Sequence, residues 1–348
     1  MRILLTADPE IEVPPRLYGG AERLVDGLLR QLKSDGHEVG LAARKGSRSP
    51  ADAFFPWPGG SSQVAMDTIA NSWTLWNAVR AFRPDVIHSF SRLAYLPPLL
   101  RGRIPIVMSY GRDPTPRTVR MAVRLAARNV LAFDGCSDYI AGLGQRGGGE
   151  WHAIPNFVDT EFLTFSPKVA PDAPLLFLSR VEEIKGAHWA IEIAKRCKQR
   201  LIIAGNHGET GGEGEYWRNV VVPQLGRDGI EYVGPVNDEQ KNKLYGGSKA
   251  LLVPIQWDEP FGLVFAEAMA CGTPVISCPR GGLPQIVRHG IDGFLIKSIE
   301  EGCEAVGKIG SIDRAGCRKQ IVDNFTQRVV VGRFVELYSQ MIARLAAT

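Results

Sequence analysis

Short apolar runs alternate with segments of helical periodicity along most of the chain. The first apolar run, residues 2–6, precedes residues 21–33, where Leu24, Val25 and Leu28 fall on one face of a helix. The same alternation predicts strands at residues 38–43, 85–89, 105–109, 129–133, 175–179, 200–205, 230–234, 250–254 and 274–278. It predicts helices at residues 67–82, 116–128 and 186–197, from about residue 261, and at 326–346. Such alternation is typical of parallel sheets with helices on both faces.

The alternation is interrupted between residues 155 and 172, a stretch with three prolines and little regular pattern. We interpret this stretch as an interdomain linker. The sequence thus predicts an α/β protein of two doubly wound, Rossmann-like domains, residues 1–160 and 161–325. Residues 326–348 would form a C-terminal helix that packs across both domains. Ligands of such folds bind at the carboxyl ends of the strands, here in a cleft that both domains face.

The composition fits this picture and excludes some functions. The chain has 348 residues, 45% apolar and 22% charged, enough for two domain cores. A net charge of +4 is too small for a dedicated nucleic-acid binder. The six cysteines form no CxxC pair, so we expect reduced, mostly buried thiols. No apolar run has the length of a signal peptide or membrane helix, so we expect a cytoplasmic protein.

The most specific stretch runs from Glu259 to Glu267, with the sequence EPFGLVFAE. The first carboxylate precedes a predicted helix and the second lies on it. A helix N-terminus exposes backbone N–H groups, and Gly262 allows a ligand to approach closely. This loop can therefore bind sugar hydroxyls and a phosphate together. The alternative is that both glutamates are ordinary surface residues near a helix start.

Three further turns also follow predicted strands and lead into helices. They are residues 179–186, which include Arg180 and Lys185, residues 279–284, and residues 18–23 near the N-terminus. Fixed cations beside glycine-rich helix starts bind a diphosphate and stabilise it as a leaving group.

Together these motifs resemble glycosyltransferase family 4, which has the two-domain GT-B fold and a retaining mechanism. The resemblance covers nearly the whole chain. Beyond Arg180, Lys185 and the EPFGLVFAE stretch, it rests on residues 19–22 (GGAE), 83–88 (RPDVIH), 154–159 (IPNFVD) and 281–284 (GGLP). It implies transfer of a sugar from a nucleotide diphosphate sugar, with UDP favoured over GDP. The acceptor would be a hydroxyl of a glycan, a lipid-linked or a small molecule.

The resemblance also implies roles for single residues. Arg180 and Lys185 would bind the diphosphate and act with Glu259 as the catalytic set. Glu259 would contact the donor sugar, helped by backbone N–H groups of Phe261, Gly262 and Leu263. Glu267 would bind the ribose hydroxyls. The N-terminal domain would contribute the acceptor side, with Gly19 and Gly20 bordering the diphosphate.

One departure affects the acceptor side. The family commonly has His-Gly after the strand at 105–109, where this chain has Tyr110, Gly111 and Arg112. Either another loop supplies the function, or Tyr110 or Arg112 replaces the histidine. Glu22 is a further candidate on this side. If activity was lost with the histidine, the chain would be a noncatalytic nucleotide-sugar-binding protein; a GT-B epimerase or phosphorylase is another alternative.

Three other features of the sequence give weaker evidence of function. The letters of residues 142–147 match a dinucleotide fingerprint, but they follow a helical stretch, so we predict a surface loop and no cofactor. There is no Asp-x-Asp, so we expect no metal. His88 at a strand end is either functional or a core histidine.

A row of arginines lies along the helix predicted at residues 116–128: Arg117, Arg120, Arg124 and Arg128. Met121, Val123, Leu125 and Ala126 would dock this helix on its domain. The arginine face is either solvated or meets an anionic membrane surface at the inner face of the membrane.

Overall fold

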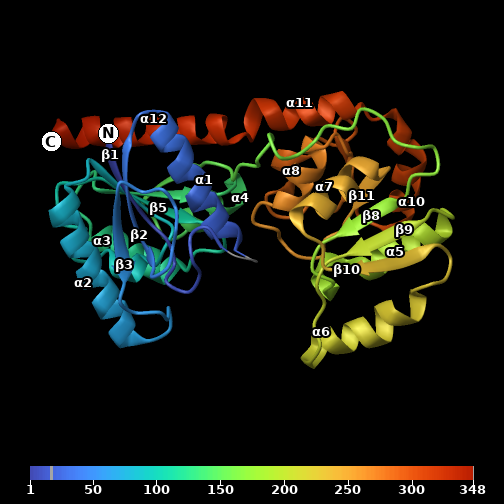
Figure 1. The fold of residues 1–348 in the computed structure, drawn as a ribbon, viewed down its shortest axis with the longest axis horizontal. Coiled ribbons are helices and arrows are strands. Elements are labelled where there is room, and N and C mark those ends of the chain that lie inside the picture. Colours follow the sequence, from blue (N-terminus) through green and yellow to red (C-terminus); the bar gives the residue numbers. More distant parts are fainter. Residues whose placement is uncertain (16–18, 348) are drawn as a thin grey trace. The chain divides into compact units, whose positions relative to one another are not determined.

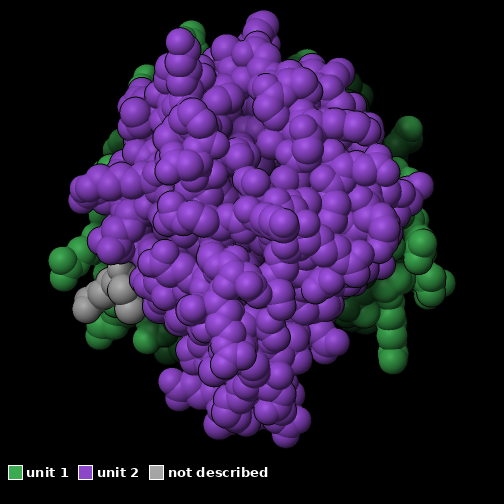
Figure 2. All heavy atoms as spheres, turned by 90° about the vertical axis from the view of Figure 1, so that its right-hand side faces the viewer, with its two compact units in different colours: residues 1–157, 327–348 green, residues 158–326 purple. Residues whose placement is uncertain are grey.

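The computed structural model describes residues 1–15 and 19–347 and divides into two compact units. Unit 1 comprises residues 1–157 and 327–348, and unit 2 comprises residues 158–326 (Figure 2). Both units are parallel α/β structures, so the predicted fold class is confirmed.

Unit 1 is built on a seven-stranded parallel sheet in the described residues (Figure 1). Its strands are β1 (Arg2–Thr6), β2 (Glu38–Arg44), β3 (Ala53–Trp57), β4 (Val86–Ser89), β5 (Ile106–Tyr110), β6 (Leu131–Gly135) and β7 (Glu150–Ala153). Their order is β3-β2-β1-β4-β5-β6-β7. The chain reverses its direction of winding between β1 and β4, which makes the carboxyl ends of these two strands the switch point where such sheets bind ligands.

Two helix layers cover this sheet. The side chains of α1 (Gly20–Ser34) and α12 (Gln327–Ala346) share one core cluster, with Leu28, Phe334 and Tyr338 among its members. The opposite face is covered by α2 (Ala65–Phe82), α3 (Pro116–Leu125), α4 (Asp138–Gln145) and the short η1 (Leu93–Tyr95). The C-terminal helix α12 thus belongs to the core of unit 1. That it packs across both domains stays a prediction.

Unit 2 repeats this topology with a six-stranded parallel sheet. Its strands are β8 (Leu175–Leu178), β9 (Leu201–Ala204), β10 (Ile230–Gly234), β11 (Ala250–Leu252), β12 (Val275–Ser277) and β13 (Gly293–Leu295), in the order β10-β9-β8-β11-β12-β13. Its helices are α5 (Ala187–Arg196), α6 (Gly211–Tyr216), α7 (Asp238–Gly247), α8 (Leu263–Ala270), α9 (Leu283–Ile286), α10 (Ile299–Lys308) and α11 (Arg314–Asn324). The switch point lies between β8 and β11.

The hydrophobic pattern did not predict three strands, namely β3, β7 and β13. Each of them is the last strand at an edge of its sheet. An edge strand pairs on one side only, so it needs less apolar sequence and tolerates proline, as β3 does at Pro56. The strand predicted at residues 129–133 is displaced to Leu131–Gly135, because Asn129 takes a left-handed turn conformation (φ 64°).

The arginine-bearing helix is shorter than predicted. Helix α3 ends at Leu125, and Ala126 is extended, so Arg128 lies outside the helix. The residues that dock α3 are Val119 and Ala122, which are buried, with Val123 packed beside them. The docking prediction for Met121 and Leu125 was wrong: their exposed fractions are 60% and 37%.

The predicted surface loop at residues 142–147 was also wrong. Gly142 and Gly144 lie inside α4, which begins after Ser137, whose side chain accepts a hydrogen bond from the Ile140 N–H. Serine at this capping position stabilises the helix start and offsets part of the cost of two helical glycines, while Ile140 and Ala141 are buried against the rest of the unit.

The segment interpreted as a linker is held by unit 2 beyond residue 158. Arg318 donates hydrogen bonds to the carbonyl oxygens of Thr160 and Leu163, and Arg314 donates to that of Ser166. Its missing hydrophobic pattern reflects this mode of attachment, because arginine side chains satisfy its backbone in place of a sheet ladder.

Candidate functional site

The turn between β8 and α5 brings the predicted cations to the switch point of unit 2. Arg180 follows β8, and Lys185 ends the short helix η2 (Glu183–Lys185). Gly186, next in the chain, has φ 78°, and a Cβ atom there would lie 2.0 Å from the carbonyl oxygen of Pro254. Only glycine permits this contact, so it sets the turn directly against the carboxyl end of β11.

Lys185 and Glu259, separated by 74 residues in sequence, form an ion pair at this point. The Lys185 Nζ donates to Glu259 Oε2 at 2.6 Å, and only 10% and 15% of the two side chains are exposed. The indole Nε1 of Trp257 donates to the same oxygen at 3.0 Å. Lys185 Nζ also lies 4.4 Å from the centroid of the Trp257 ring. Two of the three predicted catalytic residues are therefore in direct contact.

The Gly-Gly-x-Pro turn packs against the backbone of Glu259. The Gly282 N–H donates to the Glu259 carbonyl at 2.7 Å. Gly281 has φ 60°, and a Cβ there would lie 2.1 Å from the same carbonyl oxygen. The turn after β12 thus holds the loop after β11 in place.

The backbone after Glu259 enters helix α8 at Leu263, with Gly262 as its capping residue (φ 97°). The Phe261 side chain is 3% exposed, with its ring centroid 5.9 Å from that of Phe325. Because that side chain is committed to the core, Phe261 could serve a ligand only through its backbone, as the prediction assumed.

Glu267 lies on α8 and is bound by α7. Lys241 Nζ donates to its Oε1 at 3.0 Å, and the Tyr245 hydroxyl donates to its Oε2 at 2.9 Å. Burial would lower the pKa of Lys241, but the charge and hydrogen bond of Glu267, with those of Asp238, raise it. Burial raises the pKa of Tyr245 well above its usual value. No hydrogen bond or ion pair joins Glu267 to Glu259 among the described residues.

Arg180 is the most exposed member of the set, with 52% of its side chain accessible. It forms an ion pair with Glu182, which is 4% exposed. Burial raises the pKa of Glu182, and the charge of Arg180 opposes that rise. The Glu182 Oε2 atom is buried without a hydrogen-bond partner in the described part of the chain.

In unit 1, Gly19 caps α1 and Gly20 begins it, while Glu22 lies buried in its first turn. Burial raises the pKa of Glu22, and the charge of Asp8 adds to the rise. Burial likewise raises the pKa of Asp8, against the charge of Arg112. Glu22 and Arg112 therefore lie near a common carboxylate, Asp8, which the sequence analysis missed although it follows β1 at the switch point.

Tyr110 does not join this group. Its ring lies against the core, with centroids 5.5 Å from that of Trp151 and 6.3 Å from that of Phe133. Burial raises its pKa to about 12. Of the two candidates for replacing the family histidine, Arg112 is exposed and Tyr110 is half-buried.

His88 is a core histidine. It is fully buried, and its two ring nitrogens lie 2.5 Å from the Tyr338 hydroxyl and 2.7 Å from Ser109 Oγ. Ser109 donates to Asp134 Oδ2 at 2.9 Å, and the Ile154 N–H donates to Oδ1 at 3.0 Å. Burial lowers the pKa of His88 to about 3 and raises that of Asp134 to about 7. This network ties α12 to strands β4, β5 and β6.

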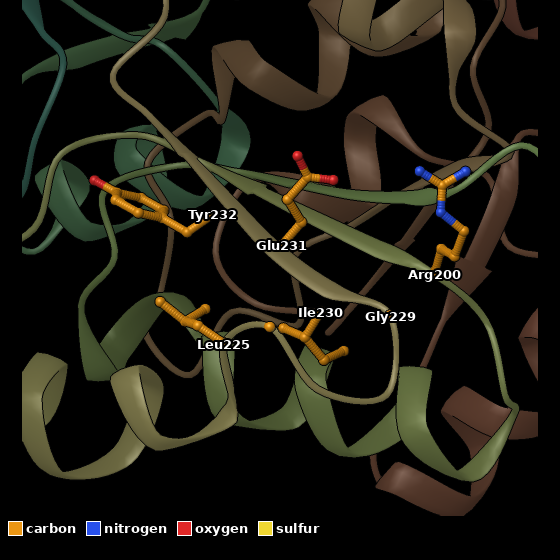
Figure 3. A pocket seen from close by; sticks show the side chains of 7 residues that line it. Arg200, Leu225, Gly229, Ile230, Glu231 and Tyr232 are labelled. Atoms are coloured by element: carbon orange, nitrogen blue, oxygen red, sulfur yellow. The ribbon is translucent and has the colours of Figure 1, made fainter.

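A cavity of about 470 Å³ lies elsewhere in unit 2 (Figure 3). It is lined by Arg200, Leu225, Gly226, Gly229, Ile230, Glu231 and Tyr232. Arg200 and Gly229 precede β9 and β10, so the cavity opens near the amino ends of the strands, while the motif residues follow the carboxyl ends. No predicted site residue lines it.

Among residues 1–15 and 19–347, no three His, Cys, Asp or Glu side chains gather in a way that could hold a metal ion. No helix in that part of the chain combines the length and apolar character that a membrane span requires.

Comparison with known proteins places this geometry in a family. Residues 160–308 match the model of glycosyl transferases group 1, and residues 18–162 match that of Glycosyltransferase Family 4. The structure of AviGT4, a glycosyltransferase involved in avilamycin A biosynthesis, is similar with a TM-score of 0.72 and 25% identity, over 98% of both chains. Alr3699/HepE of Anabaena, solved in complex with UDP-glucose, gives 0.71 and 20% identity, over 98% of this chain and 100% of that one.

Relatives found by sequence comparison are consistent with these family matches. The α-maltose-1-phosphate synthase of Mycobacterium tuberculosis is 27% identical over 329 residues, 82% of each chain. An uncharacterized glycosyltransferase of Methanocaldococcus jannaschii is 33% identical over 155 residues, 43% of this chain and only 38% of that relative's length. The protein is thus a glycosyltransferase of the GT-B class. Within that class it belongs to family 4, as the sequence motifs predicted.

Proposed function

We propose that the protein is a retaining transferase that moves a sugar from a nucleotide diphosphate sugar, with UDP-sugars preferred, to an acceptor hydroxyl. The Lys185–Glu259 ion pair at the ends of β8 and β11 carries this proposal. It places a cation for the diphosphate and a carboxylate for sugar hydroxyls within one hydrogen bond, beside the start of α8. The bound UDP-glucose of the Anabaena neighbour supports the choice of donor.

The mechanism needs positioned charge more than a strong protein base. The acceptor hydroxyl would attack the anomeric carbon from the side of the leaving group, and a phosphate oxygen of the donor would take its proton. Lys185 and Arg180 would stabilise the departing diphosphate, while Glu259 orients the sugar. Glu267 would bind the ribose, and Gly19 and Gly20 would border the diphosphate. With two cations for the diphosphate, the reaction would require no metal and no cofactor.

A panel of nucleotide sugars tests this proposal. Slow hydrolysis of one donor, with thermal stabilisation by the same donor, is the expected result for a transferase awaiting its acceptor. Tight binding without turnover would instead support a noncatalytic nucleotide-sugar-binding protein. Interconversion of the donor sugar, or release of a sugar phosphate, would support an epimerase or a phosphorylase.

The proposal extends to a peripheral contact with an anionic membrane through α3, which would suit a lipid-linked acceptor. Arg117, Arg120 and Arg124 are exposed, and no ion pair joins them to an acid among the described residues. Exposed apolar side chains occur on the same layer of helices: Met121 on α3, and Met66, Ile69 and Trp73 on α2, with 71%, 63% and 63% of the last three exposed. Both helices cover the same face of the sheet.

Cations and exposed apolar groups together favour an anionic leaflet, where each arginine contributes about 1 kcal/mol. The cytoplasmic leaflet carries such a charge, so we assign the contact to that side.

Flotation with anionic and neutral vesicles tests this proposed membrane contact. Binding to anionic vesicles should be lost when Arg117, Arg120, Arg124 and Arg128 become glutamine. A matched control replaces four exposed cations of unit 2, Lys168, Lys198, Arg227 and Lys308. Equal partitioning with both vesicles would leave only a solvated face.

A further inference from the structure

Trp257 lies in the loop between β11 and α8, two residues before Glu259, and belongs to none of the motifs that identified the family. It nevertheless touches both members of the central ion pair. Its Nε1 donates to Glu259 Oε2 at 3.0 Å, and its ring centroid lies 4.4 Å from Lys185 Nζ. The side chain is half-buried.

The hydrogen bonds leave the Glu259 carboxylate with two different oxygens. Oε2 accepts from both Lys185 and Trp257, while no hydrogen bond from the described residues reaches Oε1. About 15% of the Glu259 side chain is exposed. The carboxylate is thus held in one orientation by two donors, with its second oxygen left for a hydroxyl group of a ligand. An oriented carboxylate needs little reorganisation when the transition state forms.

The face of the Trp257 ring contacts Lys185, the other member of the ion pair. An ammonium group 4.4 Å from an indole centroid is attracted by the ring quadrupole, and the attraction is largest for tryptophan. Lys185 is therefore held from two sides, by the Glu259 carboxylate and by the Trp257 ring. When a diphosphate draws the ammonium toward itself, the ring contact can persist, because it has less directional demand than a hydrogen bond.

We propose that Trp257 is a positioning residue of the transferase: its N–H orients Glu259 toward the donor sugar, and its ring holds Lys185 toward the diphosphate. This inference rests on the roles proposed above for Lys185 and Glu259. The N–H and the ring face of Trp257 would thus have separate functions, and different substitutions can remove them one at a time.

Two substitutions make the test. Trp257→Phe keeps a ring face but removes the N–H, so kcat should fall about tenfold or more, as expected for losing a hydrogen bond to a charged group. Its affinity for UDP should change less than about threefold. Trp257→Leu removes the ring as well, so UDP affinity should weaken by a further factor of about three to thirty. UDP binding is measured by calorimetry and kcat with the preferred donor; GDP replaces UDP if the donor panel selects a GDP-sugar.

A double-mutant cycle separates positioning from simple loss of packing. In a Glu259→Gln background, Trp257→Phe should lower kcat less than it does in the wild type, because its target has already changed. The matched control is Trp217→Phe, in the same unit, where the ring stacks on His207 at 4.0 Å and makes no hydrogen bond or ring contact with Lys185 or Glu259 in the described part of the chain. That variant should keep both kcat and UDP affinity.

The outcomes distinguish this inference from the proposed function. Wild-type turnover together with wild-type kcat and UDP affinity in both Trp257 variants would overturn the role of Trp257 alone. Equal losses in Trp257→Phe and Trp257→Leu, additive with Glu259→Gln and matched by a lower melting temperature, would reduce Trp257 to a packing residue. A wild-type protein that turns over no nucleotide sugar would refute the transferase proposal, and this inference with it.

Discussion

The two units share the order of six strands, but their main sets of interacting polar side chains differ in burial and charge. In unit 1, a network of hydrogen-bonded side chains lies within the core, each at most 9% exposed: His88, Ser109, Asp134 and Tyr338. In unit 2, the polar groups at the candidate site are two ion pairs, with 10–19% of each side chain exposed: Lys185–Glu259 and Lys241–Glu267.

The physical consequence differs accordingly. A fully buried network favours neutral forms, because burial penalises charge, and each member needs its partner in place. The network of unit 1 therefore stabilises the attachment of α12. Partly exposed ion pairs keep their charge and can exchange partners with a charged ligand at modest cost. We therefore expect the first set to control stability, and we propose that the second set serves activity.

The largest effect is expected from Lys185→Ala. Removing one preorganised cation should lower turnover by about 10² to 10³-fold while the melting temperature stays near that of the wild type. Steady-state kinetics and thermal denaturation measure the two quantities. Near-normal turnover in a folded variant would remove Lys185 from the diphosphate site; Arg180→Ala, which breaks a more exposed ion pair, should lower turnover in the same direction.

Substitutions of Glu259 and Glu267 should affect different kinetic parameters. Glu259→Gln changes a contact to the transferred sugar, so kcat should fall about tenfold to a hundredfold. Glu267→Gln changes a ribose contact made equally in ground and transition states, so the donor KM should rise about tenfold with kcat little altered. Donor saturation curves of both variants decide the matter. The opposite pattern would require exchanging the two roles.

In unit 1, the network should control the pH dependence of stability. Asp134 has a folded pKa of about 7 against an ordinary value of 3.8, so its contribution to the free energy of unfolding falls as pH rises from about 4 to 7. His88 has a folded pKa of about 3 against 6.5, so its contribution rises with pH between about 3 and 6.5. The two trends oppose each other in the wild type.

Single substitutions should uncover each trend. Asp134→Asn should make stability rise more steeply with pH between 4 and 6.5, and His88→Asn should make it fall. Each should also cost about 1–3 kcal/mol through a disturbed buried hydrogen bond. Urea denaturation over this pH range measures both, and turnover per folded molecule should stay near that of the wild type. A loss of turnover without a change in stability would break the division between the units.

The smallest effect is expected from chelation. Because Lys185 and Arg180 are proposed to neutralise the diphosphate, turnover should be unchanged by excess EDTA. Loss of activity that magnesium restores would show that the cations of unit 2 do not suffice, and would revise the mechanism.

The sequence predicted the fold class well, because buried parallel strands need apolar runs and the helices between them need an apolar face. It failed at β3, β7 and β13, where an edge strand makes weaker demands on its residues. It also extended α3 by three residues past Leu125, since a run of alternating basic and apolar residues continues the helical pattern while the backbone turns at Ala126.

For the candidate site, local sequence indicated which residue types follow which strands, because glycine-rich turns and charges at strand ends are visible in the chain itself. Pairing across the chain was not visible. Only the folded sheet brings Lys185 to Glu259, 74 residues away, and places the Trp257 indole against both. Tertiary structure also decided that His88 is buried and that Glu267 is held by Lys241 and Tyr245. The reason is physical: periodicity records the burial of each element, whereas contacts between side chains depend on how the strands are ordered in the sheet.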